Sequence, residues 1–265
     1  MSLRALSRSG VLGLLAVLLA VLSLSAQAPK SPAEASQTML ATFTTVNLGM
    51  TADYENVIKN DLIPAQKQGG LQMRRTYSQG AFGEGAMYAT FTPVTSLSQF
   101  DAPSPVAKAL GEDGAAQLMQ KTARMITSRR TVLIRTRPDL GLPGDMKAEP
   151  SPLVLVTELQ VAPGRRLEFE AFIKKEVVPV MQQAKVKSYA VLEVLYGDEG
   201  GKYITALPFD SYDAIGKGHP LQIVLGEEGM KRLEAKAAGF ITHLQRHIAR
   251  YRPELSFVAS KTTSH

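Results

Sequence analysis

The stretch Arg135-Thr136-Arg137-Pro138-Asp139-Leu140 recurs 115 residues later as Arg250-Tyr251-Arg252-Pro253-Glu254-Leu255. Sliding the chain against itself by this offset aligns about 98 positions without a gap, and about 25 of them are identical. A gap-free register of this length indicates an internal duplication. We therefore interpret the 265-residue chain as two copies of one unit, residues 39–140 and 153–258.

The ends of the copies carry turn and linker signals. Pro138 and Pro253 follow the last predicted strand of each copy and are expected to end it. Residues 141–152 are rich in Pro and Gly and have no apolar periodicity, so they are predicted to link the copies. Residues 259–265 are predicted to be a C-terminal tail.

Both copies predict the same order of elements. Each begins with an alternating strand, followed by apolar residues at helical spacing up to Pro64 or Pro179, where the helix should kink or stop. Two strands joined by a Gly-rich turn follow, and then a second helix, whose apolar positions in the second copy extend to Leu244. The predicted strands cover residues 40–46, 72–79, 87–91 and 131–137, and 153–161, 189–196, 203–207 and 246–252.

The order β-α-β-β-α-β is that of the ferredoxin-like motif, a four-stranded antiparallel sheet with both helices on one face. The bare face of each sheet must be buried, and packing two such sheets together gives an α/β barrel. The predicted fold class is therefore α+β, with two tandem βαββαβ ferredoxin-like repeats that form an intramolecular barrel of the dimeric type. Because the repeats can pair with each other, a monomer would be sufficient.

Two repeated motifs resemble a known superfamily. Ile58-Lys59-x-x-x-x-Pro64, repeated as Ile173-Lys174-x-x-x-x-Pro179, and the closing Arg-x-Arg-Pro segments resemble the dimeric α/β-barrel superfamily in a tandem form, with a looser similarity to NIPSNAP-type domains. The resemblance covers nearly all of the chain after the N-terminal segment. The superfamily includes monooxygenases, haem-degrading enzymes, lyases and many members of unassigned activity. The resemblance thus implies a fold and not a reaction.

The N-terminal segment has the pattern of a secretory signal peptide. Arg4 and Arg8 precede an apolar run over residues 11–24, and small residues follow. The signal peptide is predicted over residues 1–26, and residues 27–38 are predicted to be a flexible tether. A run of about 14 apolar residues is short for a membrane span of about 20. A periplasmic or secreted protein is therefore preferred over one with an uncleaved anchor, and membrane contact is expected only through the signal sequence.

The composition excludes several kinds of site. The chain has no cysteine, which excludes disulfides, thiolate metal sites and cysteine nucleophiles. The formal net charge of +6 becomes +4 without the two leader arginines, and the basic clusters are interleaved with acids, so no nucleic-acid partner is expected. The Gly-x-Ser-x-Gly, Walker, His-Glu-x-x-His and EF-hand motifs are also absent from the sequence.

Polar residues on the predicted strands indicate a site in the barrel interior. Arginine pairs with carboxylates and tyrosine donates hydrogen bonds, so the expected ligand is a small acidic or aromatic organic molecule bound between the two sheets. The alternative is that these groups satisfy one another inside the barrel. The predicted ligand-binding residues are Tyr88, Arg135, Glu158, Glu193, Tyr203, His247 and Arg250.

Three classes of function fit this reading. An exported ligand-binding protein leads, followed by a cofactor-free monooxygenase or isomerase with Tyr203, His247 or Glu193 in proton transfer, and by an envelope protein-interaction module. No catalytic residue is assigned, and no cofactor or metal is expected. His243 and His247 would share a metal only on one helix. Haem ligation by His219, His243 or His247 is left to a direct test.

Overall fold

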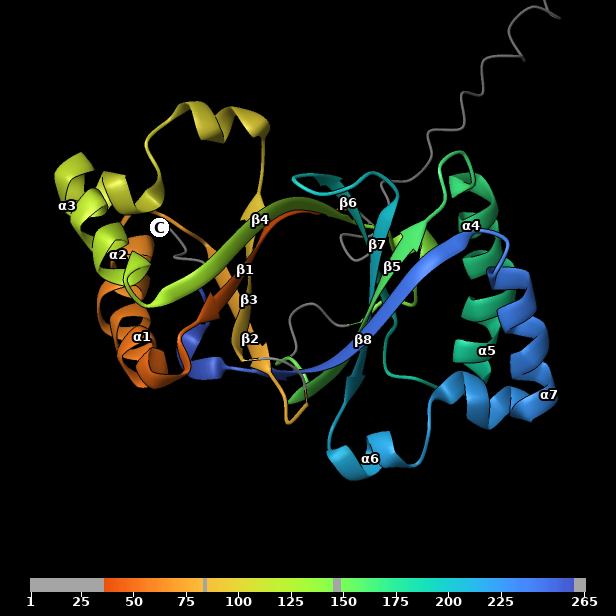
Figure 1. Ribbon diagram of the computed structural model, residues 1–265. Helices are drawn as coiled ribbons and strands as arrows, with labels where there is room; N and C mark the ends of the chain where they lie inside the picture. The colour runs from red at the N-terminus through yellow and green to blue at the C-terminus, as the bar shows by residue number, and fades with distance from the viewer. Residues whose placement is uncertain (1–35, 83–84, 145–148, 260–265) are drawn as a thin grey trace, which may run out of the picture. The chain divides into compact units, whose positions relative to one another are not determined.

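Both sequence repeats fold into the predicted order of strands and helices (Figure 1). The computed structural model describes residues 36–82, 85–144 and 149–259. The first repeat contains β1 (Thr38–Val46), a 3-10 turn (Leu48–Met50), α1 (Thr51–Val57), a π-helical turn (Ile58–Leu62), α2 (Ile63–Gln68), β2 (Met73–Gln79), β3 (Ala86–Val94), a 3-10 helix (Leu97–Asp101), α3 (Pro105–Ala123), β4 (Ile126–Thr136) and a 3-10 turn (Pro138–Leu140). The second contains β5 (Leu153–Val161), α4 (Arg166–Phe172), a π-helical turn (Ile173–Val177), α5 (Val178–Gln183), β6 (Ala190–Tyr196), β7 (Lys202–Phe209), α6 (Tyr212–Gly216), α7 (Pro220–Ala237), β8 (Ile241–Tyr251), a 3-10 turn (Pro253–Leu255) and β9 (Phe257–Val258).

The strands of the two repeats close into one antiparallel barrel. Neighbouring strands follow the order β3-β1-β4-β6-β7-β5-β8-β2, and β2 pairs again with β3 to complete the ring. Two of these pairings join the repeats, because the end of β4 pairs with β6 and the end of β8 pairs with β2. The short β9 pairs with the start of β2. The predicted fold class, two ferredoxin-like repeats in an intramolecular barrel, is confirmed.

Each repeat covers the outside of its own half of the barrel with helices. Figure 1 shows α1, α2 and α3 against the strands of the first repeat, and α4, α5 and α7 against those of the second. An apolar cluster lies under each helical layer, around Ile58 in the first repeat and Ile173 in the second. A third cluster, in which Ala41 and Ile134 are fully buried, lies in the barrel interior. Both halves of the sheet therefore have apolar clusters on their two faces, although the first part of β4 and of β8 is exposed.

The prediction for the prolines in the first helix of each repeat was a kink or a stop, and the structure shows no stop but an irregular turn directly before each proline. Pro64 and Pro179 each follow a π-helical turn, in which Ile63 donates its N–H to the Ile58 carbonyl oxygen. Proline lacks the N–H and crowds the carbonyl four residues before it, and the wider turn accommodates both defects. The helix consequently continues to Gln68 in the first repeat and on to a matching end in the second.

The second helix of the second repeat is shorter than predicted. It ends at Ala237, and Leu244 lies in β8 opposite Leu159 of β5. β5 needs a hydrogen-bonded partner along its whole length, and β8 supplies one from Ile241 onward. Strand pairing thus overrides the helical spacing of the apolar residues. In the first repeat, β4 likewise begins before the predicted start of the strand.

The predicted signal peptide, residues 1–26, lies outside the described residues, as does most of the predicted tether, residues 27–38. Within the described part of that tether, Gln37 donates its N–H to the Thr136 hydroxyl, and Thr38 already belongs to β1. The chain is therefore fixed against β4 before the predicted start of the first repeat. In the described ranges, no helix combines the length and apolar character needed to cross a membrane.

The predicted linker and tail both begin with residues bonded to the other repeat. In the linker, residues 141–152, Leu142 forms a β-bridge with Tyr189 at the start of β6. Ala259, the described residue of the predicted tail, donates its N–H to a backbone carbonyl at the start of β2. Each repeat therefore ends in an arm that extends past its last strand and pairs with its neighbour.

Candidate functional site

The structure divides the seven predicted site residues between the two faces of the barrel wall. Glu158 and His247 face the interior, as the register of β5 and β8 against the apolar Val156 shows. The prediction of one interior pocket is therefore wrong for the remaining five. These lie on the face toward the helices, where Tyr88 and Tyr203 belong to the helix-covered clusters; the five are Tyr88, Arg135, Glu193, Tyr203 and Arg250.

Three of these residues belong to one hydrogen-bonded network in the second repeat. The Tyr203 hydroxyl donates to Glu170 Oε1 at 2.7 Å. Arg137 donates to both oxygens of Glu170, at 2.7 and 2.9 Å, and to Glu193 at 3.0 Å. Arg135 donates to the same Glu193 oxygen at 2.7 Å. The network, which we call the Glu170 network, joins arginines of the first repeat to carboxylates of the second.

The first repeat has the matching arrangement at the equivalent positions. The Tyr88 hydroxyl donates to Glu55, and Arg252 donates to both oxygens of that carboxylate at 2.7 Å. Ser78 occupies the position equivalent to Glu193, so this copy lacks the second carboxylate at that position. The two contacts between the repeats, Arg137 with Glu170 and Arg252 with Glu55, are related by the same offset as the sequence repeats. They therefore belong to the duplicated fold rather than to a site in one repeat.

The Arg-x-Arg-Pro motif has two roles. β4 ends at Thr136 and β8 ends at Tyr251, which confirms that the motif terminates the last strand. Its second arginine then crosses to a glutamate on the first helix of the other repeat, a role that the sequence analysis missed. The sequence did contain a signal for this contact. The glutamate and the second arginine are each identical in the two copies, as Glu55 and Glu170 and as Arg137 and Arg252.

The groups of the Glu170 network are poorly suited to proton transfer at neutral pH. Burial and the hydrogen bond to Glu170 raise the pKa of Tyr203 above its ordinary value, so the hydroxyl stays protonated. Burial also raises the pKa of Glu193, but the hydrogen bonds from Arg135 and Arg137 outweigh this effect and hold the pKa below its ordinary value. A carboxylate that stays ionised and fully paired is typical of a structural network.

Glu158 and His247 lie near a charged group of side chains inside the barrel. Lys202 Nζ is 3.4 Å from Glu158 and 2.9 Å from Asp198, and Arg130 also pairs with both carboxylates. Burial lowers the pKa of His247, although the charge of Glu158 opposes this effect, so the imidazole is neutral at pH 7. These contacts favour the alternative in which the interior charges satisfy one another.

The three histidines in the described part of the chain, His219, His243 and His247, do not form a metal site. His243 and His247 both lie on β8, where four residues of extended chain span about 13 Å. His219 accepts a hydrogen bond on Nδ1 from the Leu221 N–H at the start of α7, and burial lowers its pKa to about 4. In the part of the chain that the structure describes, no three His, Asp or Glu side chains come together as metal ligands.

A buried polar group that the sequence analysis did not nominate lies under the helices of the first repeat. Arg74 on β2 is 5% exposed and donates to the Leu255 carbonyl at 3.2 Å and to Gln66 Oε1 and Thr90 Oγ1 at 3.3 Å. All three acceptors are neutral, and among the described residues no carboxylate lies within ion-pair distance of Arg74. Burial lowers the pKa of the guanidinium to about 10, with Arg129 acting in the same direction.

The second repeat has no such polar group at the equivalent positions. We call the polar side chains around Arg74 the Arg74 cluster; they are Thr44, Tyr54, Gln66, Arg74, Thr76 and Thr90. The equivalent residues, in the same order, are Leu159, Phe169, Met181, Tyr189, Val191 and Thr205. One repeat thus folds with a largely apolar layer at positions where the other buries a cation and several hydroxyls. The ferredoxin-like fold does not require these polar groups.

The side chains of the Arg74 cluster are of the types that pair with anions. Its three hydrogen bonds are longer than the usual length of about 2.9 Å, and a carboxylate would be a stronger acceptor than any of the neutral groups now present. Burial raises the pKa of Tyr54, whose hydroxyl therefore stays protonated and can donate a hydrogen bond. The cluster thus combines a fixed positive charge with a neutral donor in a dry environment.

Comparisons with known proteins agree on the fold. No family model matches the sequence, and no curated protein matches it. Among solved structures, an anthrone oxidase-like protein is similar with a TM-score of 0.57 and 14% identity, covering 88% of this chain and 97% of its own. A protein from Fusobacterium nucleatum provisionally named a monooxygenase gives 0.55 and 8% identity, covering 81% and 92%. A similarly named protein from Lactobacillus acidophilus gives 0.53 and 12%, covering 84% and 96%. The chain therefore has the dimeric α/β-barrel fold that these proteins share, built here from two repeats of one polypeptide.

Proposed function

We propose that the protein binds a small organic acid at the Arg74 cluster, between the sheet and the helices of the first repeat. The observation that carries the proposal is the buried Arg74 guanidinium, whose hydrogen-bond acceptors are all neutral. The proposal keeps the acidic ligand expected from the sequence and moves it out of the barrel interior. That interior holds an apolar cluster that includes Ala41 and Ile134, and its charged groups pair with one another.

The energetic argument compares the two repeats. A buried cation without a counter-charge costs several kcal/mol, which proteins normally offset with a carboxylate or a bound anion. Tyr189 occupies the position of Arg74 in the second repeat, and the fold forms there without a charge. A cost that the fold does not need is typical of binding sites, where stability is exchanged for recognition. The missing negative charge is then the ligand's.

The test replaces Arg74 with the residue of the second repeat, Arg74→Tyr. Acetate, succinate and benzoate are titrated into the wild-type protein and the variant by calorimetry, with the melting temperature as a second readout. At least one carboxylate is expected to bind the wild type, and its affinity is expected to fall about 100-fold in the variant, the usual loss when a buried charge partner is removed. Arg124→Tyr, at an exposed position, is the control for net charge and should retain wild-type affinity.

Two results would contradict this proposal. The first is that the wild-type protein binds none of the three carboxylates at 10 mM, roughly the limit of a useful site, and also shows no retained acidic small molecule. The retained molecule is sought by native mass spectrometry after purification of the protein from its own host. The other is a carboxylate that binds wild type and Arg74→Tyr equally well. In the second case the acid would bind elsewhere, and the buried cation would have a structural role.

A cofactor-free monooxygenase or isomerase is the second candidate. The fold is shared with proteins provisionally named monooxygenases and with an anthrone oxidase-like protein. Of the residues nominated for proton transfer, His247 is neutral at pH 7 and can accept a proton. Incubation with anthrone in an oxygen electrode tests the oxygenase form, in which one dioxygen per anthrone gives anthraquinone and water. Oxygen uptake equal in wild type and His247→Gln would contradict that role for His247.

Export from the cytoplasm is part of the proposal and rests on residues 1–26. Cleavage by signal peptidase is expected to leave a mature N-terminus near Gln27, because small residues precede that position and Pro29 follows. Intact-mass measurement of the protein from the periplasm or medium of its host checks this expectation. A protein found only in the cytoplasmic fraction and retaining Arg4 and Arg8 would contradict it.

A further inference from the structure

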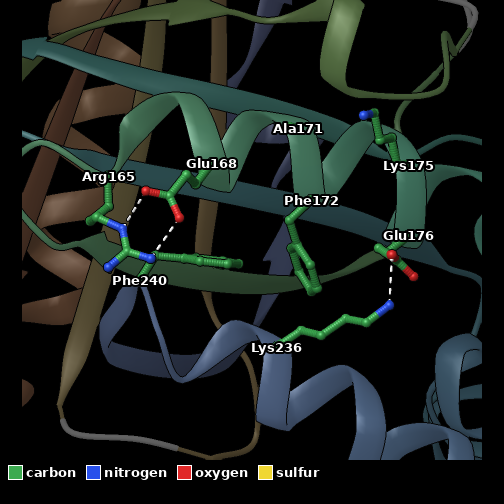
Figure 2. Close-up of a pocket in the computed structure, with 8 residues that line it drawn as sticks. All are labelled: Arg165, Glu168, Ala171, Phe172, Lys175, Glu176, Lys236 and Phe240. Carbon is green, nitrogen blue, oxygen red and sulfur yellow. Dashed lines mark hydrogen bonds and ion pairs between the residues drawn. The ribbon is translucent and has the colours of Figure 1, made fainter.

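An open groove of about 430 Å³ lies on the outer surface of the second repeat, between α4 with its π-helical turn and α7 (Figure 2). This volume is within the range of small-molecule sites, about 300–1,000 Å³. The groove belongs to the other repeat and the outer side of the helical layer, so it is separate from the Arg74 cluster. Its lining residues are Arg165, Glu168, Ala171, Phe172, Lys175, Glu176, Lys236 and Phe240.

The apolar part of the groove is aromatic. Figure 2 shows the rings of Phe172 and Phe240 lying between the charged ends of the groove. Their centroids are 5.1 Å apart with an angle of 61° between the planes, and Phe169 lies behind Phe240 at 6.3 Å. Phe240 is buried, whereas Phe172 is only partly buried and contributes to the open surface of the groove. A planar apolar group can therefore contact a phenyl ring that is held in place by other rings.

The rim of the groove carries one positive charge in excess. Arg165 donates to Glu168 at 2.6 Å, and Lys236 donates to Glu176 at 2.8 Å, so four of the five charged side chains neutralise one another. The fifth, Lys175, has no hydrogen bond or ion pair to any residue that the structure describes. Figure 2 shows the Lys175 side chain at the edge of the groove, directed away from the two rings. The groove thus has an ammonium group without a counter-charge on its rim.

Only part of this arrangement follows from the duplicated fold. The ion pair between Lys236 and Glu176 has an equivalent in the first repeat, where Lys121 donates to Asp61 at 2.7 Å. The aromatic and cationic residues have no such equivalents, because Phe172, Phe240 and Lys175 correspond to Val57, Met125 and Asn60. The ion pair therefore bridges the two helices at equivalent positions in both repeats. The rings and the extra lysine are additions of the second repeat.

We infer that this groove is a second binding site, for a small planar aromatic anion such as an aryl carboxylate. The aromatic ring of the ligand lies against Phe172 and Phe240, and its carboxylate pairs with the Lys175 ammonium after that flexible side chain turns toward the rings. Binding is weak, because the site is open and an exposed ion pair contributes about 1 kcal/mol or less. The inference does not depend on the Arg74 cluster.

The test titrates 1-naphthoate, with 1-naphthalenemethanol as the neutral probe of the same shape and cyclohexanecarboxylate as the non-aromatic acid. Two-dimensional NMR of the mature full-length protein follows amide shifts in α4 and α7. Naphthoate is expected to bind about fivefold more tightly than the alcohol, because the alcohol lacks the ion pair, and about fivefold more tightly than cyclohexanecarboxylate, because that acid lacks the ring contact. High salt should remove the advantage over the alcohol, because it screens the exposed charge pair.

Two variants take their residues from the first repeat. Lys175→Asn is expected to weaken naphthoate binding about fivefold and leave the alcohol unchanged, and Phe172→Val should weaken both probes. Lys174→Asn removes the neighbouring charge, which pairs with Asp139 outside the groove, and should leave naphthoate binding within twofold of wild type.

The Arg74→Tyr variant separates this site from the proposed one and should bind naphthoate in the groove as the wild type does. Naphthoate shifts confined to residues around Arg74 would overturn the inference. So would equal affinity in wild type and Lys175→Asn, or the absence of saturable shifts in α4 and α7.

Discussion

Arg137→Met is expected to lower the free energy of unfolding by about 3 kcal/mol or more, which corresponds to a fall in melting temperature of about 10 °C for a chain of this size. Arg137 is 13% exposed and is bonded to two carboxylates, Glu170 and Glu193, that are 16% and 11% exposed. Methionine keeps much of the volume and removes the charge, so both carboxylates are left largely buried with fewer partners. Removing one member of a buried charge network is costly for this reason.

The control for this variant is Arg165→Met. Arg165 and Glu168 form an exposed pair, at 43% and 54% exposure, so the variant should remain within about 0.5 kcal/mol of wild type. The equivalent contact of the first repeat, between Arg252 and Glu55, is tested by Arg252→Met. This variant should lower the free energy of unfolding by less than Arg137→Met does, because Glu55 is more exposed and Ser78 replaces the second carboxylate. Equal effects of Arg137→Met and Arg165→Met would contradict a stabilising role for the Glu170 network.

The pH dependence of the difference in unfolding free energy between wild type and Arg137→Met supplies a second readout. The hydrogen bond from Arg137 lowers the pKa of Asp139 to about 2, against an ordinary value of about 4, and Arg137 also holds the pKa of Glu170 below its ordinary range. A carboxyl group with a lowered folded-state pKa adds stability above its unfolded-state pKa and loses it as the pH falls through the folded value. The gap between wild type and Arg137→Met should therefore narrow between about pH 4 and pH 2. Urea unfolding across this range measures it.

The repeat made the fold predictable from the sequence, because each element could be identified twice. Which side chains of each strand point into the barrel was harder to predict. In this barrel each strand is covered by helices on one face and by the opposite strands on the other, so alternation of apolar residues does not tell which face is which. Tyr88 and Tyr203 were placed in the interior for this reason, although they pack under the helices. Glu158 and His247 do lie on the interior face, as the register of β5 against β8 shows.

The contacts between the repeats were hidden for a different reason. Arg252 and Glu55 are separated by 197 positions, and no local pattern connects residues at that distance. The comparison of the two copies does carry the information, because charges of opposite sign are conserved between them at both ends of the contact. The same comparison, read for differences, identifies Arg74 against Tyr189. Identity between repeats thus marked the structural contacts, and asymmetry marked the candidate site.

Without ligand, Arg74→Tyr is expected to melt at the wild-type temperature or as much as about 6 °C above it. The variant removes a buried charge, and replacing such a charge with a well-packed neutral group often stabilises a protein. Tyr189 bonds to Thr205 in the second repeat, and Thr90 is available to the new hydroxyl at the same position. Differential scanning calorimetry of the ligand-free protein gives the melting temperature.

The competing interpretation is that Arg74 is a clamp on the C-terminal arm, because it donates to the Leu255 carbonyl. That carbonyl also accepts a hydrogen bond from Thr76 at 2.9 Å, so it stays satisfied when Arg74 is replaced. Thr76→Val, which again takes the residue of the second repeat, should cost about 1 kcal/mol through this shorter bond. If Arg74→Tyr melts below Thr76→Val, the clamp outweighs the cost of the buried charge. The energetic premise for an acidic ligand then fails, because the charge would stabilise the fold without one.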